Sequence, residues 1–315
     1  MIRPSDAARA AILRGALTKY RRDNCWLPGL APTGHVDCLV VQLVDSLRRI
    51  EFIFQVRDKI HSPKRAVPGS GLFDPLRAAA MHSRAGNVDE AFWLVFVATH
   101  FGKHATDGWR LAEAVYGKLG QGGLWDWPST RKDLKGFRTW VAKNQSILKG
   151  ADGVSRRFSN HRKYESVLAG SKKGLPAVVE SYVNWIAAAR GHQALIRQIH
   201  KEVGQEPREV FNAMYKNMDA VTRFGRLGKF DYLTMLGKLG IAPIEPGSAY
   251  LREATGPMAG ARLLFLGDTA DKKHDRVMDS WLLQLDNALG VGMQPLEDAL
   301  CNWQKSPDKH TYFRG

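Results

Sequence analysis

The chain has 315 residues, and 46 Lys and Arg against 31 Asp and Glu give it a formal net charge of +15 at pH 7. This length is sufficient for one large domain or two lobes with a buried core. The 44% of hydrophobic and 24% of charged residues are ordinary for a globular protein and exclude a largely disordered chain. The charge surplus predicts a polyanionic partner, either nucleic acid or an anionic membrane.

The charge surplus lies mainly in the middle of the chain. Residues 101–200 hold 17 Lys and Arg against 7 Asp and Glu, whereas residues 251–315 hold 8 against 9. For any single basic side chain, an ordinary solvated surface is the simpler explanation. For the segment as a whole we expect DNA or another nucleic acid as the partner.

Neither membrane insertion nor a disulfide scaffold is indicated. The longest apolar runs, CLVVQLV from Cys38 and AFWLVFVA from Ala91, are too short to span a bilayer, and the N-terminal segment lacks the pattern of a secretory signal. Cys25, Cys38 and Cys301 are widely spaced and form no CxxC pair, which disfavours a structural zinc site. We expect a cytoplasmic monomer that binds no membrane, no metal ion and no cofactor.

Apolar residues recur with the 3.6-residue period of a helix in nearly every patterned segment. Positions 36, 39, 40, 43, 44, 47, 50 and 54 follow this period and predict one long helix. Asp74 before Pro75 predicts a capped helix start, and Asn87 with Glu90 three residues later resembles a capping box. The same periodicity predicts further helices over residues 129–148, 176–190, 207–221, 257–265, 275–289 and 295–303.

The lack of alternating strand patterns and hairpin dipeptides predicts an all-α fold of ten or more helices. We expect loops at residues 61–71, 120–130 and 150–175, of which the last is long enough to carry function. The expected organisation is an N-terminal helical region over residues 1–86 and a helical catalytic or DNA-binding region over residues 87–315. One continuous domain is the alternative.

The segment THFGKH, Thr99–His104, places basic side chains at the end of an apolar helix. In the simplest interpretation Gly102 ends the helix, and His100, Lys103 and His104 face its C-terminal dipole. The three nitrogen donors could instead bind a metal ion, although the spacing implies no carboxylate or thiolate nearby. Because a basic helix end can also face phosphate, His100 and Lys103 are candidate DNA-binding residues.

The segment RRFSNHRKYE, Arg156–Glu165, interleaves basic and aromatic side chains. This combination suits contact with backbone phosphates together with stacking on bases. The plainer alternative is an exposed basic loop with one aromatic anchor. Glu165 is the only acid of the cluster, and we expect it to orient Arg162. The candidate substrate-binding or DNA-binding residues here are Arg156, Arg157, Phe158, Asn160, His161, Arg162, Lys163 and Tyr164.

The segment RFGRLGKFDYL, residues 223–233, contains two glycines that are expected to permit a tight turn flanked by Arg226 and Lys229. Asp231 then falls near the start of the next helix, and helix capping is the simple explanation for it. The alternative is a carboxylate that Arg223, Arg226 and Lys229 hold ionised, so that it can accept a proton.

The segment ATGPMAGARLLF, residues 254–265, places Gly256 and Pro257 before a predicted helix. Free amides at a helix start bind phosphate, although Gly-Pro before a helix is usually only a turn. Gly256 and Arg262 are the candidate substrate-binding residues of this segment. Motifs of the G-x-S-x-G, HExxH, DFG and DxDxDG types are missing from the sequence, which argues against a common hydrolase, zinc protease, kinase or calcium protein.

Taken in order, THFGKH, GWR, NHRKYE, GRLGKFDYL and YLREATGPMAGARLLF resemble the alpha-glutamyl/putrescinyl thymine pyrophosphorylase family, clade 3. The resemblance extends from about Asp89 to about Asp286. Ser159 stands where we expect glycine in this family, so the turn before Asn160 is expected to differ. The family is associated with hypermodified thymine in bacteriophage DNA and with the two-lobed helical fold of DNA glycosylases of the helix-hairpin-helix class.

The resemblance implies a transferase reaction in the cytoplasm of a bacterium or a phage-infected host. A 5-hydroxymethyluracil in DNA, activated as a pyrophosphate ester, is attacked by an amine, either an amino acid or putrescine, and pyrophosphate leaves. Asp231 is the first candidate for the catalytic base and Glu165 the second. Phe158 or Tyr164 would stack on a flipped base. The leaving pyrophosphate would be stabilised by Arg162, Arg226, Lys229 and the Gly256 amides.

Two other functions compete with this transferase. The first is a DNA glycosylase or lyase of the same helical class, which would need a catalytic Asp and often a Lys nucleophile. The second is a basic DNA-binding protein without enzymatic activity. Converging side chains of Asn160, Arg162, Arg226 and Asp231 would favour an enzyme, whereas a basic face without a converging carboxylate would favour simple binding.

Overall fold

The computed structural model describes residues 3–24 and 27–312, and these residues form fourteen α-helices and no β-strand. The all-α prediction is confirmed. None of the described helices is long and apolar enough to cross a membrane. Cys25 lies outside the described residues, and Cys38 and Cys301 form no disulfide within them. The helices are α1 (Ala7–Asp23), α2 (His35–Asp58), α3 (Pro75–Arg84), α4 (Val88–Phe101), α5 (Arg110–Tyr116), α6 (Trp127–Lys132), α7 (Leu134–Leu148), α8 (Leu175–Ala188), α9 (His192–Val203), α10 (Pro207–Asn217), α11 (Arg226–Lys238), α12 (Thr255–Leu266), α13 (Met278–Leu289) and α14 (Met293–Trp303).

The helices group into two compact units. The first unit contains the described residues of 1–53 and 246–314, and the second contains residues 54–245. Helix α2 begins in the first unit and ends in the second. The division that the sequence suggests after residue 86 falls inside the second unit and stays a prediction.

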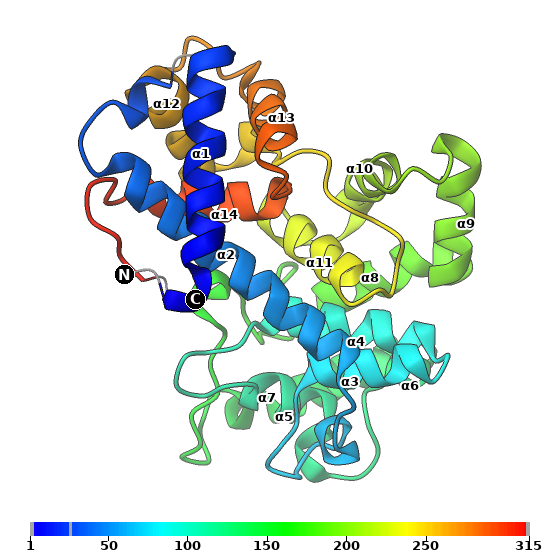
Figure 1. The fold of residues 1–315 in the computed structure, drawn as a ribbon. Coiled ribbons are helices and arrows are strands. Elements are labelled where there is room, and N and C mark those ends of the chain that lie inside the picture. Colours follow the sequence, from blue (N-terminus) through cyan, green and yellow to red (C-terminus); the bar gives the residue numbers. More distant parts are fainter. Residues whose placement is uncertain (1–2, 25–26, 313–315) are drawn as a thin grey trace. The chain divides into compact units, whose positions relative to one another are not determined.

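The first unit is a helical bundle of α1, the greater part of α2, and α12, α13 and α14 (Figure 1). Helix α12 packs on α14 at close range, and two glycines permit this approach. A Cβ atom on Gly256 would lie 2.7 Å from the Sγ atom of Cys301, and one on Gly260 would lie 2.3 Å from the carbonyl oxygen of Leu300. Trp303 is fully buried in the core of this unit.

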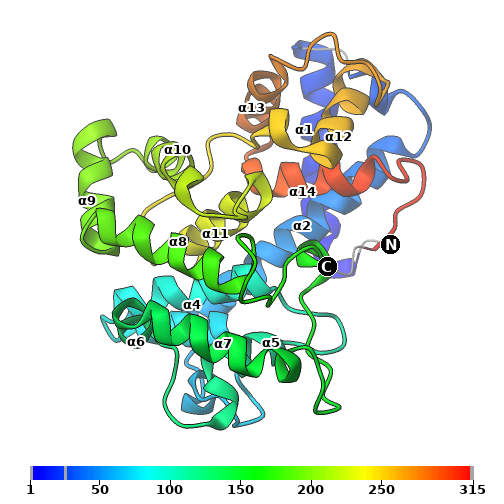
Figure 2. The ribbon, with the colours of Figure 1, turned by 180° about the vertical axis from the view of Figure 1, so that it is seen from behind.

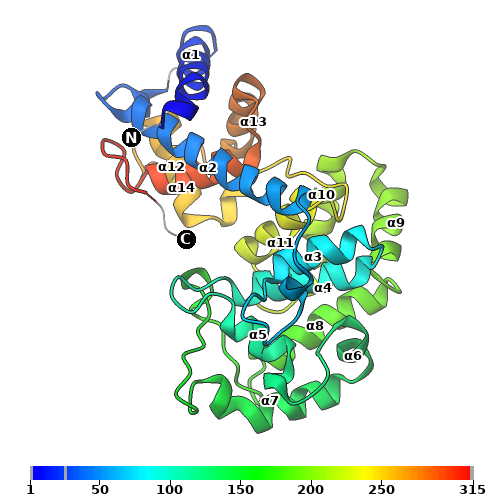
Figure 3. The same cartoon turned by 60° about the horizontal axis from the view of Figure 1, so that its bottom comes forward.

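The second unit is built around α4, which is buried at nearly every position. Helices α3, α5, α6, α9 and α11 all pack against α4, and Figures 1 and 3 show α3 and α4 side by side. The predicted caps are confirmed at both helix starts: the Asp74 carboxylate accepts hydrogen bonds from the N–H groups of Leu76 and Arg77, and the Asn87 side chain accepts one from Glu90 N–H.

The loop predicted at residues 150–175 is confirmed, because no α-helix lies between α7 and α8. Figure 2 shows this segment in green. Two other predictions need correction. The loop expected at 120–130 ends early, since α6 begins at Trp127, and the helix expected over 129–148 is divided at Asp133. The Asp133 carboxylate caps α7 by accepting a hydrogen bond from Gly136 N–H at 2.7 Å, which explains the new start.

Candidate active site

The C-terminal end of α4 places His100 inside the second unit. Its imidazole is 2% exposed and lies among the rings of Phe96, Phe101, Phe158 and Phe224. Burial, reinforced by the charges of Arg162 and Arg223, lowers the pKa of His100 to about 3. The ring is therefore neutral at physiological pH, and its buried Nε2 atom has no hydrogen-bond partner among the described residues.

Gly102 lies at the end of α4, where the helix contacts the long loop at Ser159. As predicted, it ends the helix, with φ +64° and ψ 161°. The N–H of Ser159 donates to the carbonyl oxygen of Phe101 at 3.0 Å, and a Cβ atom on Gly102 would lie 2.1 Å from the Ser159 hydroxyl oxygen. The segments THFGKH and NHRKYE therefore meet at a contact that only glycine permits at position 102.

Arg162 and Asp231 form the central ion pair of the site. The Nη2 atom of Arg162 donates to Oδ2 of Asp231 at 3.0 Å, with the two side chains 10% and 40% exposed. Gly228 lies against both Phe224 and Arg162, because a Cβ atom there would lie 3.2 Å from the Phe224 ring and 3.4 Å from Arg162 Nη1. The segments NHRKYE and GRLGKFDYL, which lie far apart in the sequence, thus converge on one carboxylate.

The capping interpretation of Asp231 is wrong. Helix α11 begins at Arg226 and its N-cap is Gly225, so Asp231 lies in the second turn. For the same reason Gly228 lies inside the helix and not in a tight turn. The carboxylate of Asp231 therefore caps no helix and can take part in catalysis.

Of the cations predicted to hold Asp231 ionised, Arg226 acts on its carboxylate, whereas Arg162 takes the place of Arg223 and Lys229. Burial raises the pKa of Asp231, and the charges of Arg162 and then Arg226 only partly oppose this effect. A carboxylate with a raised pKa is a stronger base than an exposed aspartate. This property suits the acceptance of a proton from a substrate.

Glu165 pairs with Arg223 and does not orient Arg162 as predicted. The Nε atom of Arg223 donates to Glu165 Oε1 at 3.0 Å, and its Nη2 atom donates to the carbonyl oxygen of Tyr164 at 2.8 Å. Arg223 adopts a left-handed backbone conformation, with φ +67°. Burial raises the pKa of Glu165, and its Oε2 atom is buried without a hydrogen-bond partner in the described structure.

Arg226 and Lys229 are both buried in α11 and make contacts that stabilise the fold. The guanidinium of Arg226 lies over the ring of Phe230, 4.6 Å from its centroid. The ammonium of Lys229 bonds to Asp219 at 2.5 Å and lies 3.9 Å from the centroid of the Tyr215 ring. Their predicted catalytic roles stay predictions.

Arg156 and Arg157 are each held by a carboxylate. Arg156 is 10% exposed and binds Asp152 through both terminal nitrogens. Arg157 binds the buried Asp107, and this hydrogen-bonded pairing lowers the pKa of Asp107 well below its usual range. A DNA phosphate would have to compete with these carboxylates, so the predicted DNA contacts of both arginines remain untested.

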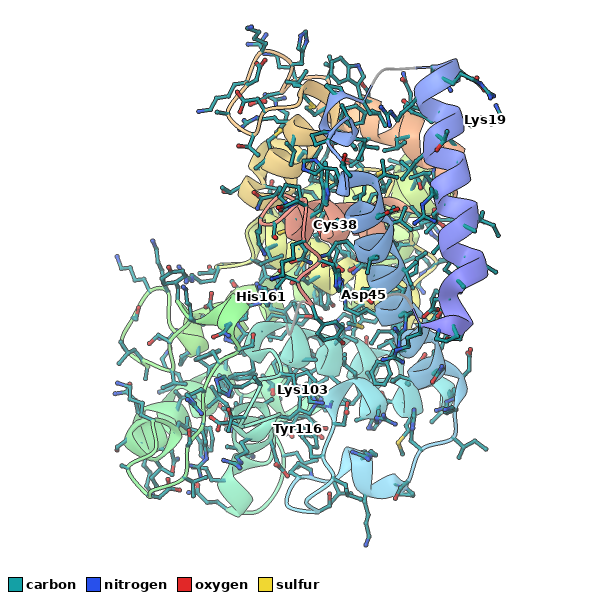
Figure 4. All side chains as sticks on the ribbon, turned by 60° about the vertical axis from the view of Figure 1, so that its left-hand side comes forward. Lys19, Cys38, Asp45, Lys103, Tyr116 and His161 are labelled. Atoms are coloured by element: carbon teal, nitrogen blue, oxygen red, sulfur yellow. The ribbon has the colours of Figure 1, made fainter. Side chains whose placement is uncertain are left out.

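Five predicted DNA-binding residues are placed for contact with a large ligand. Tyr164 is 78% exposed, and the ammonium of Lys163 lies 5.1 Å from its ring centroid. Phe158 is half-buried between Phe101 and His100, so Tyr164 is the better placed of the two to stack on a base. Figure 4 labels Lys103 and His161, which come from the segment after α4 and from the long loop. Apart from Arg157, which is paired with Asp107, the exposed residues are Lys103, Asn160, His161, Lys163 and Tyr164.

Gly256 and Arg262 belong to the first unit, and structural contacts explain both. Gly256 provides the close approach of α12 to α14 described above. Arg262 binds the Asp275 carboxylate through two nitrogens, at 2.8 and 2.5 Å.

His104 accepts hydrogen bonds from the N–H groups of Thr106 and Asp107 and so closes a turn. Within residues 3–24 and 27–312, no group of three or more His, Cys, Asp and Glu side chains is placed to hold a metal ion.

A hydrogen-bonded chain that is buried except at Asp89 supports the site and was missed in the sequence. Asp89 bonds to His192 Nδ1 at 2.7 Å, His192 Nε2 to the Tyr182 hydroxyl at 2.9 Å, and Tyr182 to the Tyr232 hydroxyl at 2.8 Å. Because Tyr232 is the neighbour of Asp231, this chain fixes α11 relative to α4 and α8. Its four members lie in four separate helices and share no motif, so no local pattern could reveal them.

Two carboxylate–guanidinium pairs, a neutral buried imidazole and an exposed tyrosine with Lys163 beside it thus come together in the second unit. A family model described as alpha-glutamyl/putrescinyl thymine pyrophosphorylase clade 3 matches residues 34–315, a range that includes all of these residues. No curated protein and no solved structure was found to match the chain.

Proposed function

The chain belongs to the alpha-glutamyl/putrescinyl thymine pyrophosphorylase family, clade 3, and from this premise we propose that it transfers an amine to an activated thymine derivative in DNA. The substrate is a 5-hydroxymethyluracil whose hydroxyl carries pyrophosphate. The amine nitrogen forms a bond to the methylene carbon, and the bond from that carbon to the pyrophosphate oxygen breaks. The observation that carries this proposal is the ion pair of Asp231 and Arg162.

Asp231 acts as the base in this reaction. An amine attacks only through its free electron pair, so the nitrogen must lose a proton before or during attack. The carboxylate of Asp231 is reachable at 40% exposure, and its raised pKa increases its basicity. Arg162 orients the carboxylate by a hydrogen bond from a side chain that is itself largely buried. Glu165, with a free buried oxygen atom, is the second candidate for this role.

Lys103 and Lys163 are suited to neutralise the leaving pyrophosphate. Both are exposed, and neither forms an ion pair with any described residue. Lys229, in contrast, is already paired with Asp219. Cations placed where negative charge develops are among the strongest contributions to catalysis.

The distribution of charge supports DNA as the partner. The second unit holds 30 Lys and Arg against 17 Asp and Glu, a net charge of +13, whereas the first unit holds 16 against 14. A base inside a duplex is inaccessible, so the enzyme would flip it out at a cost of a few kcal/mol. Tyr164, the most exposed aromatic side chain near the site, would stack on the flipped base. The two-lobed glycosylase-like architecture and the setting in a phage-infected cell belong to the same proposal.

A glycosylase or lyase is the competing reaction on the same substrate. A lyase needs a reactive lysine, but Lys229, the lysine on α11 nearest in sequence to Asp231, is 5% exposed and ion-paired. This contact argues against Lys229 as the nucleophile of a lyase, whereas Lys238 of the same helix lies near enough for its charge to act on Asp231.

The experiment that separates the reactions is mass spectrometry of nucleosides after incubation with pyrophosphorylated 5-hydroxymethyluracil DNA and a mixture of amines. We expect a thymidine derivative that carries an amine, together with released pyrophosphate. Release of a free base or an abasic strand break would instead identify a glycosylase. Binding without any covalent change would identify a DNA-binding protein.

A further inference from the structure

The exposed side of α7 carries lysines and no acidic residue. Lys135, Lys143 and Lys149 are all exposed, and they point away from the side of the helix that is buried in the second unit. Figures 2 and 3 show α7 on the outside of this unit. The exposed positions between the lysines hold only small side chains, those of Thr139, Ala142 and Ser146.

The turn that precedes α8 adds two lysines beside this helix. The N–H of Ala169 donates to Gln145 Oε1 at 3.0 Å, and Arg138 Nη1 donates to the carbonyl oxygen of Ala169 at 3.1 Å, so α7 holds the base of the turn. Lys172 and Lys173 follow in the same turn, and both are exposed. Helix and turn together form a lysine face, made of Lys135, Lys143, Lys149, Lys172 and Lys173.

The carboxylates of this part of the chain are already engaged. Residues 127–175 hold 12 Lys and Arg against 3 Asp and Glu. Asp133 closes the start of α7, and arginines bind the other two acids and Glu180 of the neighbouring α8. The pairs are Arg156 with Asp152, Arg223 with Glu165 and Arg138 with Glu180. The five lysines form no ion pair with any residue that the structure describes.

The spacing of the lysines fits the backbone of duplex DNA. Lys135 and Lys149 lie at the two ends of α7, about 21 Å apart at 1.5 Å per residue. Duplex DNA carries one negative charge about every 1.7 Å of its axis, so a face of this length meets the phosphates of about six base pairs. The small side chains between the lysines leave room for the backbone to approach.

The lysine face is not built to read bases or to enter a membrane. The amide side chains of α7 are already used, because Asn144 donates to the Trp140 carbonyl oxygen and Gln145 accepts from Ala169. No large apolar side chain of α7 is exposed, whereas a helix that lies in a membrane surface needs an apolar side to insert. Contact with phosphates alone, independent of sequence, therefore fits this face best.

We propose that the lysine face binds the phosphate backbone of double-stranded DNA and is a surface separate from the ion pair of Asp231 and Arg162. It lets the protein hold DNA that contains no substrate base. The proposal goes beyond the transfer reaction and does not depend on it, because unmodified DNA presents the same phosphates.

The first test is the salt dependence of binding to a labelled, unmodified duplex of about 30 base pairs. The variant combines Lys135→Gln, Lys143→Gln and Lys149→Gln. We expect its affinity to fall at least about tenfold at low salt. The slope of log K against log salt concentration should fall by about 0.9 for each lost contact, and so by about 2–3 in all.

The matched control combines Lys59→Gln, Lys201→Gln and Lys216→Gln, which removes three exposed lysines of the second unit that lie outside the lysine face. Both variants lose the same net charge, so their difference reports the position of the lysines. The control should keep a slope close to that of the wild type. An equal change in the control, or an unchanged slope in the α7 variant, would overturn the proposal.

A photo-crosslinking amino acid, p-benzoylphenylalanine, in place of Lys143 checks the contact directly. Irradiation of the complex should attach this position to the duplex, and the same amino acid in place of Lys201 should give no product. No product at position 143, or tighter binding of an RNA duplex of the same length through these lysines, would overturn the assignment to DNA. Binding through the lysine face without an aminated nucleoside would refute only the transfer reaction, and amination with unchanged binding in the α7 variant would refute only the lysine face.

Discussion

Glu90 lies inside the second unit at 3% exposure, where Oε1 accepts a hydrogen bond from the Tyr116 hydroxyl and Oε2 one from Trp127 N–H. Burial raises the pKa of Glu90 from 4.5 to about 7. Between these two pH values, Glu90 is protonated in the native protein but ionised in the unfolded chain. The free energy of unfolding contributed by this residue therefore falls as pH rises, by about 3 kcal/mol across the window.

The variant Glu90→Gln should lack this dependence, because an amide does not titrate. Its carbonyl oxygen can accept from Trp127 N–H, and its amide can donate to the Tyr116 oxygen. Urea unfolding of both proteins at pH 4.5 and pH 7.5 checks the prediction. Between pH 4.5 and pH 7.5, the free energy of unfolding of the variant should rise by about 3 kcal/mol relative to that of the wild type. Parallel pH profiles of the two proteins would show that Glu90 titrates normally.

Glu90 also shows what the local sequence could not predict. Asn87 and Glu90 match a capping box, and the Asn87 half is confirmed. Glu90 instead turns into the core, because the hydroxyl and N–H groups buried opposite it need acceptors. Those partners come from α5 and α6, so this part of the environment could not be predicted from the local sequence.

At the scale of the helices and loops, Gly102 is the joint between α4 and the loop that carries Arg162. We expect Gly102→Ala to reduce stability by about 1–3 kcal/mol. The added methyl group meets Ser159 at 2.1 Å, and the backbone conformation is one that only glycine adopts easily. The displaced loop should also weaken the contact of Arg162 with Asp231, so transfer activity should fall more than stability alone explains.

Gly86→Ala is the control for Gly102→Ala. Gly86 also has a positive φ, +77°, but a Cβ atom there would meet nothing within 4 Å. It should lose some stability and keep its activity. Equal loss of activity in both variants would mean that the contact with Ser159 does not position the site.

Most helices were predictable from the sequence because one face of each is apolar. Helix α11 was also predicted, but its start was not, because its first residues include the buried charged side chains of Arg226 and Lys229. A first turn that holds buried charged side chains and a glycine does not show the apolar pattern of a helix, so the start of α11 was placed about one turn too late. Gly228 added to this error, since a glycine inside a helix looks like a turn residue in the sequence.

On the scale of the whole molecule, the charge of +15 proves to be almost entirely a property of the second unit. The concentration of basic residues in 101–200 was visible in the sequence. Most of their pairing was not, because Arg157, Arg162 and Arg223 meet carboxylates through tertiary contacts, and only Arg156 pairs locally, with Asp152 of the same loop. Exposed lysines without such partners are therefore the better candidates for contact with phosphate.

We expect the double variant Lys103→Gln, Lys163→Gln to bind DNA with a weaker salt dependence. Each lost phosphate contact should reduce the slope of log K against log salt concentration by about 0.9. Fluorescence anisotropy with labelled duplex DNA at several salt concentrations measures this slope. The control is Lys272→Gln, Lys273→Gln, which removes two exposed lysines of the first unit. An equal change in the control would mean that the second unit has no special role in binding.

The most direct test of the account is the rate at which the aminated nucleoside forms on pyrophosphorylated 5-hydroxymethyluracil DNA, measured by mass spectrometry for the wild type and Asp231→Asn. The asparagine can still accept the hydrogen bond from Arg162 but cannot take up a proton. We predict that the wild type forms the adduct, that Asp231→Asn is slower by a factor of roughly 10²–10⁴, and that Glu202→Gln, a change at an exposed carboxylate of α9, has no effect. Full activity of Asp231→Asn, or no adduct from the wild type with any amine, would contradict the account.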